Sequence, residues 1–252
     1  MLNIGWFSTG RDEAALQLLQ AVQDKIRSSD INGKISFVFS NREPGEAQES
    51  DLFFELVRSY NIPLVCLSHK KFKTDGEEKG WRIKYDREVN KRIEPFAPDL
   101  CVLAGYMLIV SEELCQKYDM INLHPAPPCG PTGSWQEVIW MLIQNKADTA
   151  GAMMHLVTPE LDRGQVVSYC LFSIKGAPFA EHWCNDDKEM LFRLIRQHEL
   201  AREFPLIILT LQSLSRGEVS IKYRKVIDAQ GNLISGYNIS DKIDEEVKKN
   251  LR

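Results

Sequence analysis

Three polar side chains near the middle of the chain have the types and the spacing that acid–base chemistry requires. Asn122 and His124 are separated by one residue at the end of an apolar segment, and Asp162 follows His124 by 38 residues. In a strand, residues two apart point to the same face. An amide can polarise a carbonyl group, an imidazole can carry a proton, and a carboxylate can set the state of that imidazole. None of the three is a strong nucleophile, so the set predicts direct acyl transfer between two substrates.

The same residues also fit a purely structural interpretation. An Asn-x-His pair at the end of a strand can cap a turn, and Asp162-Arg163-Gly164 can form an ordinary turn. The prolines and glycines between Pro125 and Gly133 predict a stiff, irregular loop of the kind that often binds ligands. Spacing alone therefore leaves the catalytic and the structural interpretations open.

Alternating strands and helices are expected to position these residues. Apolar runs predict strands over Leu2–Phe7, Ile35–Phe39, Pro63–Leu67 and Leu100–Ala104, and helical spacing covers Asp12–Ile26, Ala47–Tyr60 and Trp81–Phe96. This order is typical of βαβ units with a parallel sheet that is covered on both faces. Ligands of such sheets bind beyond the carboxyl ends of the strands. We therefore expect functional residues in the loops after Phe7, Phe39, Leu67, Ala104 and His124.

The pattern changes after Gly151. It predicts longer strands over Gly151–Val157 and Gln165–Ser173, a helix over Asp187–Leu214, a small hairpin from Val219, and a charged tail over 231–252. The stretch 70–80 is polar and predicts a surface loop. The fold class is thus predicted to be α/β, with a Rossmann-like, mostly parallel sheet, flanking helices and a small C-terminal extension of hairpin and helix.

Composition narrows the function classes. The 252 residues contain 31 Lys and Arg against 35 Asp and Glu, a net charge of −4, which argues against a nucleic-acid partner. No apolar run reaches the roughly 20 residues that span a bilayer, so we expect a cytoplasmic protein without a membrane partner. The six cysteines are scattered and predict reduced thiols. No metal-ligand spacing occurs, and the oligomeric state is left open between monomer and homodimer.

Two motifs resemble those of the folate-dependent formyltransferase family. They are Asn122-Leu123-His124-Pro125 and Leu161-Asp162-Arg163-Gly164. The segment Ala97–Met107 leads into the first motif as it does in that family, and Phe39–Arg42 and Tyr85–Glu88 are also similar. The pair of motifs at this separation is specific for the family, but it does not identify the formyl acceptor.

The resemblance implies roles for the three polar residues. The family's formyl donor is 10-formyltetrahydrofolate and its acceptor is an amine, here implied to be glycinamide ribonucleotide of purine biosynthesis. Asn122 would donate its amide to the formyl oxygen, and His124 would support the oxyanion and assist proton movement. Asp162 would orient His124 and accept the proton of the amine through a water. Together they would stabilise a tetrahedral intermediate electrostatically.

The resemblance also implies where the two substrates bind. Residues 1–105 would form the acceptor-binding half and residues 106–230 the catalytic and folate-binding half of one domain. The implied folate-binding residues are Met107, Leu108, Ile109, Val110, Thr158, Glu160 and Leu161. For the apolar segment from Met107 to Val110, ordinary core packing is the competing interpretation.

The implied acceptor site departs from the family pattern. Ser8, Thr9, Gly10 and Arg11 would hold a phosphate at a helix N-terminus, but Asp12 and Glu13 follow, and acids there repel an anion. Asp12 also fits a simple N-cap.

The ribose-binding residue departs as well. Glu199 would hold the ribose hydroxyls, yet it stands one residue further from Phe204-Pro205 than in the family, a rotation of about 100° on a helix. An insert at Ala177–Asp187 has no counterpart, and its role stays open.

Three alternatives therefore remain. The first keeps the donor and changes the acceptor to another amine, such as an amino sugar nucleotide. The second is hydrolysis of 10-formyltetrahydrofolate, because the same three side chains could activate water. The third is a folate-binding protein without catalysis. Formylation of methionyl-tRNA fits less well, because the C-terminal region is short and the chain is not basic.

Overall fold

The computed structural model describes residues 1–73 and 80–250, and the chain divides into two compact units. Unit 1 comprises Met1–Asn122 and Val157–Glu160. Unit 2 comprises Leu123–Leu156 and the chain from Leu161 onward. The division predicted from the sequence, into residues 1–105 and 106–230, was based on which substrate each half binds. It stays a prediction.

Unit 1 is built on parallel strands in the order β5-β4-β1-β2-β3. Their bounds are β1 Leu2–Phe7, β2 Gly33–Ser40, β3 Leu64–Cys66, β4 Leu100–Leu103 and β5 Met120–His124, of which the first three residues belong to this unit. The strands are almost continuously apolar, as expected for a sheet that is buried on both faces. Phe7 pairs with Phe39 on one side and with Leu103 on the other, so three strands end side by side.

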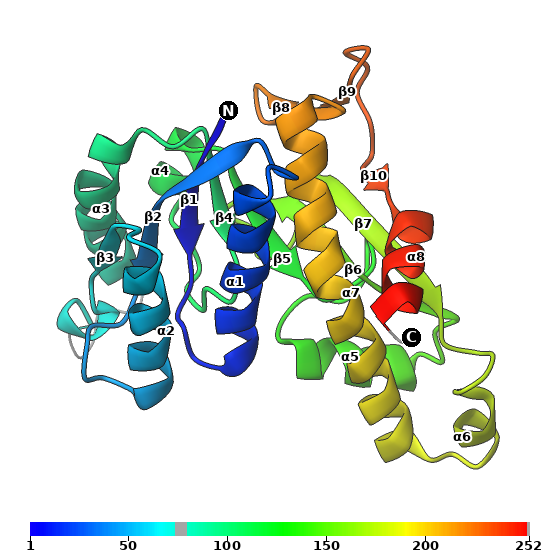
Figure 1. Ribbon diagram of the computed structural model, residues 1–252. Coiled ribbons are helices and arrows are strands. Elements are labelled where there is room, and N and C mark those ends of the chain that lie inside the picture. The colour runs from blue at the N-terminus through cyan, green and yellow to red at the C-terminus, as the bar shows by residue number, and fades with distance from the viewer. Residues whose placement is uncertain (74–79, 251–252) are drawn as a thin grey trace. The chain divides into compact units, whose positions relative to one another are not determined.

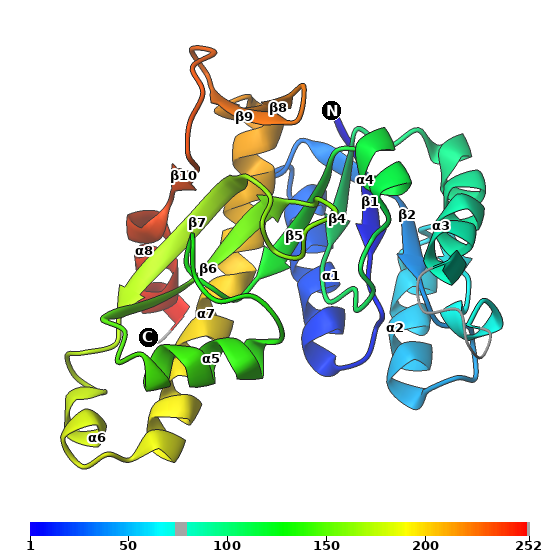
Figure 2. The same cartoon turned by 180° about the vertical axis from the view of Figure 1, so that it is seen from behind.

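Helices cover both faces of this sheet (Figures 1 and 2). α1 and α2 lie over one face, and α3 and α4 lie over the other. The bounds are α1 Glu13–Arg27, α2 Gln48–Ser59, α3 Gly80–Ile93 and α4 Glu112–Lys117, with short 3₁₀ turns η1 His69–Lys71 and η2 Glu94–Phe96. The core on the α3 side contains the rings of Phe7, Phe37 and Phe39, together with Trp81 and Tyr85 of α3.

Unit 2 is built around an antiparallel strand pair and one long helix. β6 Thr149–Leu156 pairs with β7 Val166–Ser173, and β10 Tyr237–Asn238 adds to β7 in parallel. α7 Lys188–Arg216 runs along β6, next to α5 Trp135–Gln144 and α8 Ser240–Asn250 (Figure 1). α6 Ala180–Cys184 precedes α7, and the hairpin of β8 Val219–Lys222 and β9 Lys225–Asp228 follows it.

The predicted fold class is confirmed, since the sheet is mostly parallel with flanking helices and a C-terminal hairpin and helix follow. α4, α5, α6 and β10 were not predicted. α5 reads as WQEVIWMLIQ, which is too apolar to show a clear polar face, and the others are short. Of the predicted loop 70–80, residues 74–79 lie outside the described residues, and so do residues 251–252 of the predicted tail.

Two further expectations concern cysteines and membranes. All six cysteines lie within the described residues and are free thiols, as predicted. None of the helices over residues 1–73 and 80–250 combines the length and the apolar character needed to cross a bilayer.

Candidate active site

His124 ends β5 in unit 2 and is held by the proline-rich loop that follows it. Its side chain is only 3% exposed, and its Nε2 lies 3.1 Å from the carbonyl oxygen of Pro131. A carbonyl oxygen only accepts hydrogen bonds, so Nε2 carries the proton that it donates. The loop is anchored at its start, where the N–H of Ala126 donates to the carbonyl oxygen of His124. The other ring nitrogen, Nδ1, faces Asp162 at 3.7 Å.

A second histidine, His155, faces the same carboxylate. It lies on β6, is also 3% exposed, and places its Nε2 3.5 Å from Oδ1 of Asp162. Its Nδ1 lies 2.9 Å from the carbonyl oxygen of Leu156 and is therefore the protonated nitrogen of the neutral ring. The sequence analysis missed this residue, because a single histidine in the apolar run Gly151–Val157 looks like part of a buried strand.

Asp162 lies between these two imidazole rings. Its Oδ2 accepts a hydrogen bond from the N–H of Gly133 at 3.2 Å, and the side chain is 7% exposed. Burial by itself raises the pKa of this carboxyl group. The contact with His155, the charge of His124 and the Gly133 bond together outweigh burial, so the pKa of Asp162 is lowered. The carboxylate is therefore ionised at neutral pH in an almost dry position.

Each imidazole ring of this cluster presents an unprotonated nitrogen to Asp162. In each neutral ring the nitrogen that faces Asp162 carries a lone pair, because the other nitrogen donates to a carbonyl oxygen. Protonation of either ring would place an N–H against the carboxylate. For His124, desolvation outweighs the opposing effects of the Pro131 bond and the Asp162 charge, so the pKa of the ring is lowered. The cluster of His124, His155 and Asp162 thus provides a proton acceptor with a fixed counter-ion.

A close backbone contact shapes the loop that presents Asp162. Asp162 itself has a left-handed conformation with φ 53°, which aspartate tolerates better than most residues. Two residues on, a Cβ at Gly164 would stand 1.6 Å from the carbonyl oxygen of Leu156. The N–H of Leu156 donates to the carbonyl oxygen of Gln165 across this contact. The glycine of the Leu-Asp-Arg-Gly motif is therefore required for the loop to pass β6.

Asn122 is the last residue of the first segment of unit 1. It lies on β5, two residues before His124, and pairs with Leu103 of β4 in the strand register. Its side chain is half-buried. The predicted amide donor is thus at the carboxyl end of a parallel strand, as its proposed role requires.

The predicted folate-binding residues differ in exposure. Met107 is 48% exposed and Ile109 is also exposed, whereas Val110 is buried and Leu108 packs against the core. Core packing therefore holds for Leu108 and Val110, and folate binding by this segment stays a prediction. Leu161 is exposed as well. In the loop before it, the Thr158 hydroxyl donates to the carbonyl oxygen of Glu160 at 2.9 Å.

The predicted acceptor loop after β1 is tied to its neighbours in unit 1. The Thr9 hydroxyl donates to Oδ1 of Asn41, after β2, at 2.7 Å and accepts from the N–H of Met107, after β4, at 3.0 Å. Ser8 is buried, and its hydroxyl accepts from the N–H of Gly10. The polar groups of Ser8 and Thr9 are thus already engaged within the protein.

The N-terminus of α1 is capped from within. Asp12 accepts from the N–H of Ala15 at 3.0 Å, which makes it the N-cap residue, and Arg11 lies 3.2 Å from its other oxygen. Asp12 therefore places a negative charge where a bound phosphate would lie. Phosphate binding by Ser8, Thr9, Gly10 and Arg11 stays a prediction.

Glu199 lies on α7 and has no exposed surface. Neither of its carboxyl oxygens has a hydrogen-bond partner. Burial raises the pKa of this carboxyl group well above its usual range, and the nearby Glu203 adds to the effect. The folded protein therefore favours the neutral form of this side chain. Its predicted contact with a ribose stays a prediction and would require the packing around it to open.

The insert at Ala177–Asp187 belongs to unit 2 and packs against its core. Phe179 is buried, and the indole N–H of Trp183 donates to the carbonyl oxygen of Ile174. Within residues 1–73 and 80–250, no group of three or more His, Cys, Asp or Glu side chains is arranged to hold a metal ion.

The chain is similar to known proteins of one family. The family described as formyl transferase matches residues 13–175. A phosphoribosylglycinamide formyltransferase of Escherichia coli is 32% identical over 152 residues, which cover 59% of this chain and 64% of that protein. One from Dictyostelium discoideum is 30% identical over 159 residues, covering 59% and 74%. The match to the bacterial relative thus spans somewhat less than two thirds of its length.

The fold is shared with a solved structure of phosphoribosylglycinamide formyltransferase from Coxiella burnetii, with a TM-score of 0.73 at 22% identity over 94% of this chain and 98% of that chain. A formyltetrahydrofolate deformylase of Haemophilus influenzae is 27% identical over 131 residues, covering 50% of this chain and 43% of that protein. The chain belongs to the formyl transferase family.

The close contact at Gly164 predicts that Gly164→Ala is poorly tolerated. The added methyl group forces the backbone of the Asp162 loop away from β6, and overpacking of this kind costs about 1–3 kcal/mol of unfolding free energy. Gly176→Ala is the matched control, because a Cβ there meets nothing within 4 Å. Denaturant unfolding of both variants measures the difference. Equal stability of the two variants would contradict this account of the loop.

The geometry of the cluster predicts that Asp162→Asn lowers the pKa of His124 further. The carboxylate charge raises that pKa against desolvation, and the amide removes this charge. Imidazole NMR titration measures the change, with His182 on α6 as an internal control outside the cluster. An unchanged or higher pKa of His124 in Asp162→Asn would show that the carboxylate does not act on the ring.

The burial of Glu199 predicts a pH-dependent gain in stability for Glu199→Gln. A carboxyl group with a raised folded-state pKa gives stability that is present below its unfolded pKa and lost as the pH rises through its folded pKa. Glutamine cannot ionise, so the Tm difference between variant and parent should be larger at pH 8 than at pH 5. Glu189→Gln, exposed on the same helix, should show no such trend. Thermal melts at both pH values measure the Tm difference, and an equal difference at pH 5 and pH 8 would contradict the prediction.

Proposed function

We propose that this protein is a cytoplasmic enzyme of purine synthesis that transfers the formyl group of 10-formyltetrahydrofolate to the amine of glycinamide ribonucleotide. The observation that carries the proposal is the buried Asp162 carboxylate between two imidazole rings. The phosphoribosylglycinamide formyltransferases among its relatives support the choice of donor and acceptor.

The reaction requires a proton acceptor close to the attacking nitrogen. The amine nitrogen forms a bond to the formyl carbon and loses a proton, and the donor's N10 leaves with a proton after the tetrahedral intermediate collapses. The lone pair of His124 or His155 that faces Asp162 can hold this proton, because the carboxylate stabilises the resulting imidazolium ion. The products are the formylated amine and tetrahydrofolate.

The intermediate also requires hydrogen-bond donors to its oxygen. We assign the Asn122 amide and the Nε2–H of His124 to this role. In the structure that N–H donates to the carbonyl oxygen of Pro131, a bond that the formyl oxygen would replace. Loss of one such donor typically reduces the rate by about 10²–10³-fold, or about 3–4 kcal/mol.

For the donor, we assign binding to the segment 107–110 and to Thr158, Glu160 and Leu161. Exposed apolar side chains at Met107, Ile109 and Leu161 support this assignment, because a flat heteroaromatic ring needs apolar contact surface. Val110, which is buried, would contribute only its backbone.

The acceptor side favours a second candidate, which keeps the donor and changes the amine, for example to an amino sugar nucleotide. For glycinamide ribonucleotide, Arg11 would have to leave Asp12 to pair with the phosphate, and Glu199 would have to leave its buried position. Hydrolysis of the donor is the third candidate, and the deformylase relative supports it. Water would then replace the amine at the same cluster.

The proposal is tested by following deformylation of 10-formyltetrahydrofolate by absorbance with and without glycinamide ribonucleotide. We expect strong stimulation by this amine, and a loss of at least about a hundredfold in kcat in His124→Ala and Asp162→Asn. The control variant Cys129→Ser changes an exposed residue of the proline-rich loop after His124 and should retain turnover within about twofold.

Each other outcome rejects the proposed acceptor in a different way. Stimulation by an amino sugar nucleotide alone would identify the second candidate. Formate release that no amine accelerates would identify a hydrolase. Donor binding without turnover in the parent protein would indicate a folate-binding protein that lacks catalysis.

A further inference from the structure

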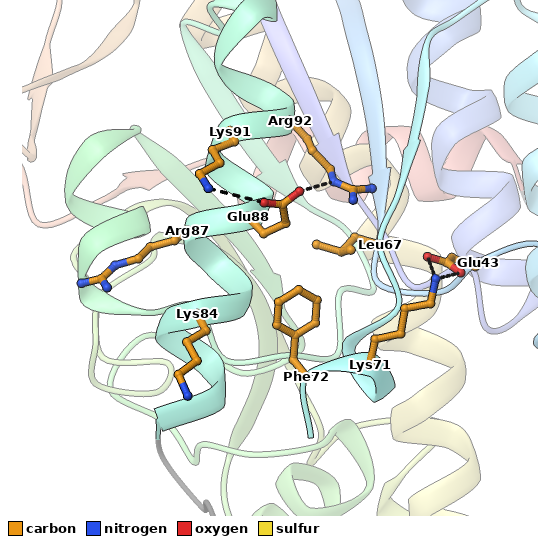
Figure 3. Close-up of a pocket in the computed structure, with 9 residues that line it drawn as sticks. All are labelled: Glu43, Leu67, Lys71, Phe72, Lys84, Arg87, Glu88, Lys91 and Arg92. Atoms are coloured by element: carbon orange, nitrogen blue, oxygen red, sulfur yellow. Dashed lines mark hydrogen bonds and ion pairs between the residues drawn. The ribbon is translucent and has the colours of Figure 1, made fainter. Parts of the chain in front are cut away.

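A hollow of about 500 Å³ lies in unit 1 between α3 and the segment that follows β3 (Figure 3). None of the residues assigned to catalysis, donor binding or acceptor binding lines it. One wall is a single face of α3, formed by Lys84, Arg87, Glu88, Lys91 and Arg92, which recur at the three- and four-residue spacing of a helix. The opposite wall is formed mainly by residues of the segment after β3.

The hollow is strongly basic although the chain is acidic. Five of its lining residues are Lys or Arg and two are Glu, so the lining carries 5 − 2 = +3 charges, whereas the whole chain carries −4. Counting Glu113, which binds Arg87 from α4, still leaves +2. Residues 74–79 lie outside the described residues and are not part of this count. A local excess of positive charge concentrates anions there.

Several of these cations contact carboxylates at or near the surface. Lys71 contacts both oxygens of Glu43, at 2.7 and 2.6 Å. Glu88 is shared by Arg92 at 3.0 Å and Lys91 at 3.8 Å, and these contacts lie at the surface. Arg87 binds Glu113 through two nitrogens, but both side chains are more than half exposed. Exposed ion pairs contribute little to stability, so the anion of a ligand can replace a protein carboxylate at small cost.

The floor of the hollow is apolar. Leu67 is buried there, and the half-buried ring of Phe72 points into the hollow (Figure 3). Phe72 contacts Tyr85 edge to face, at 5.3 Å between ring centres, so its position is fixed by the core. An apolar floor excludes water from one side of a ligand and favours an anion with a carbon skeleton over a bare inorganic ion.

We propose that this hollow binds a small organic anion that carries two or more carboxylate or phosphate groups. The charged groups lie among Lys71, Lys84, Arg87 and Lys91, and the carbon skeleton rests on Phe72. Guanidinium groups recognise both carboxylate and phosphate oxygens, so the lining residues are shared by the two chemistries. The site does not depend on the function proposed above.

The test is calorimetric titration of the full chain at low ionic strength with citrate, fructose 1,6-bisphosphate and tripolyphosphate. We expect saturable binding of one equivalent for citrate or for the bisphosphate, and the stronger of the two identifies carboxylate or phosphate as the preferred group. The affinity should fall with added salt. Tripolyphosphate, which lacks a carbon skeleton, should bind more weakly than the preferred organic anion.

Two variants separate a built site from general charge attraction. The double variant Lys84→Ala, Lys91→Ala should weaken the preferred anion at least tenfold. The matched double variant Lys34→Ala, Lys222→Ala removes the same charge at exposed lysines outside the hollow and should change affinity less than twofold. Phe72→Ala should weaken the organic anion more than tripolyphosphate.

Some results would overturn the proposal. Equal weakening in both double variants, binding that does not saturate, or an absence of heat with every probe would each do so. Thermal melts of the variants show that they are folded, so that loss of binding is not loss of structure.

Discussion

The candidate active site in unit 2 depends on one buried carboxylate. Asp162 is almost removed from water, and a charge in that position is tolerated only with close partners. Its partners come from three different elements: His124 from the end of β5, His155 from β6 and the Gly133 N–H from the loop before α5. Each element is therefore positioned relative to a single side chain.

The backbone is adapted to the same constraint. Asp162 adopts a left-handed conformation, and Gly164 passes so close to Leu156 that no side chain fits. The proline-rich loop is fixed at its far end by a capping box, in which Ser134 and Glu137 bond each other's backbone N–H groups. Stiffness at both ends of this loop keeps Pro131 against His124 and Gly133 against Asp162.

The sequence predicted local features well and long-range ones poorly. Asn122, His124 and Asp162 were chosen as candidates because they belong to short motifs, and the strands were predicted because they are continuously apolar. His155 was missed because its role comes from a contact with Asp162 that strand periodicity does not reveal. The sequence did contain an indication of this contact. Burying an imidazole without hydrogen-bond partners is energetically unfavourable, so a histidine in a buried strand indicates that polar groups lie near it. The start of α5 was also indicated in the sequence, by the capping-box pattern Ser134-x-x-Glu137 before an apolar run.

The acceptor loop shows why motif departures could not be resolved from sequence. From the sequence, Asp12 could repel a bound phosphate or act as the N-cap of α1. Its hydrogen bond from the N–H of Ala15 shows that it is the N-cap. Thr9 joins loops that are 32 and 98 residues away in the chain, so its hydroxyl was not recognisable as engaged. These bonds depend on the strand order of the sheet, which a single sequence does not contain.

Formyl transfer and formyl hydrolysis differ in the nucleophile and share the proton acceptor. The cluster of His124, His155 and Asp162 can take a proton from an amine or from water, so its geometry alone does not distinguish the two reactions. The distinction must come from residues that hold the acceptor and exclude water. In this chain those candidate residues are the ones that depart from the family pattern: Arg11 is paired with Asp12, and Glu199 is buried with a raised pKa. Under the proposed function, acceptor choice and proton transfer would therefore be carried by different parts of the chain.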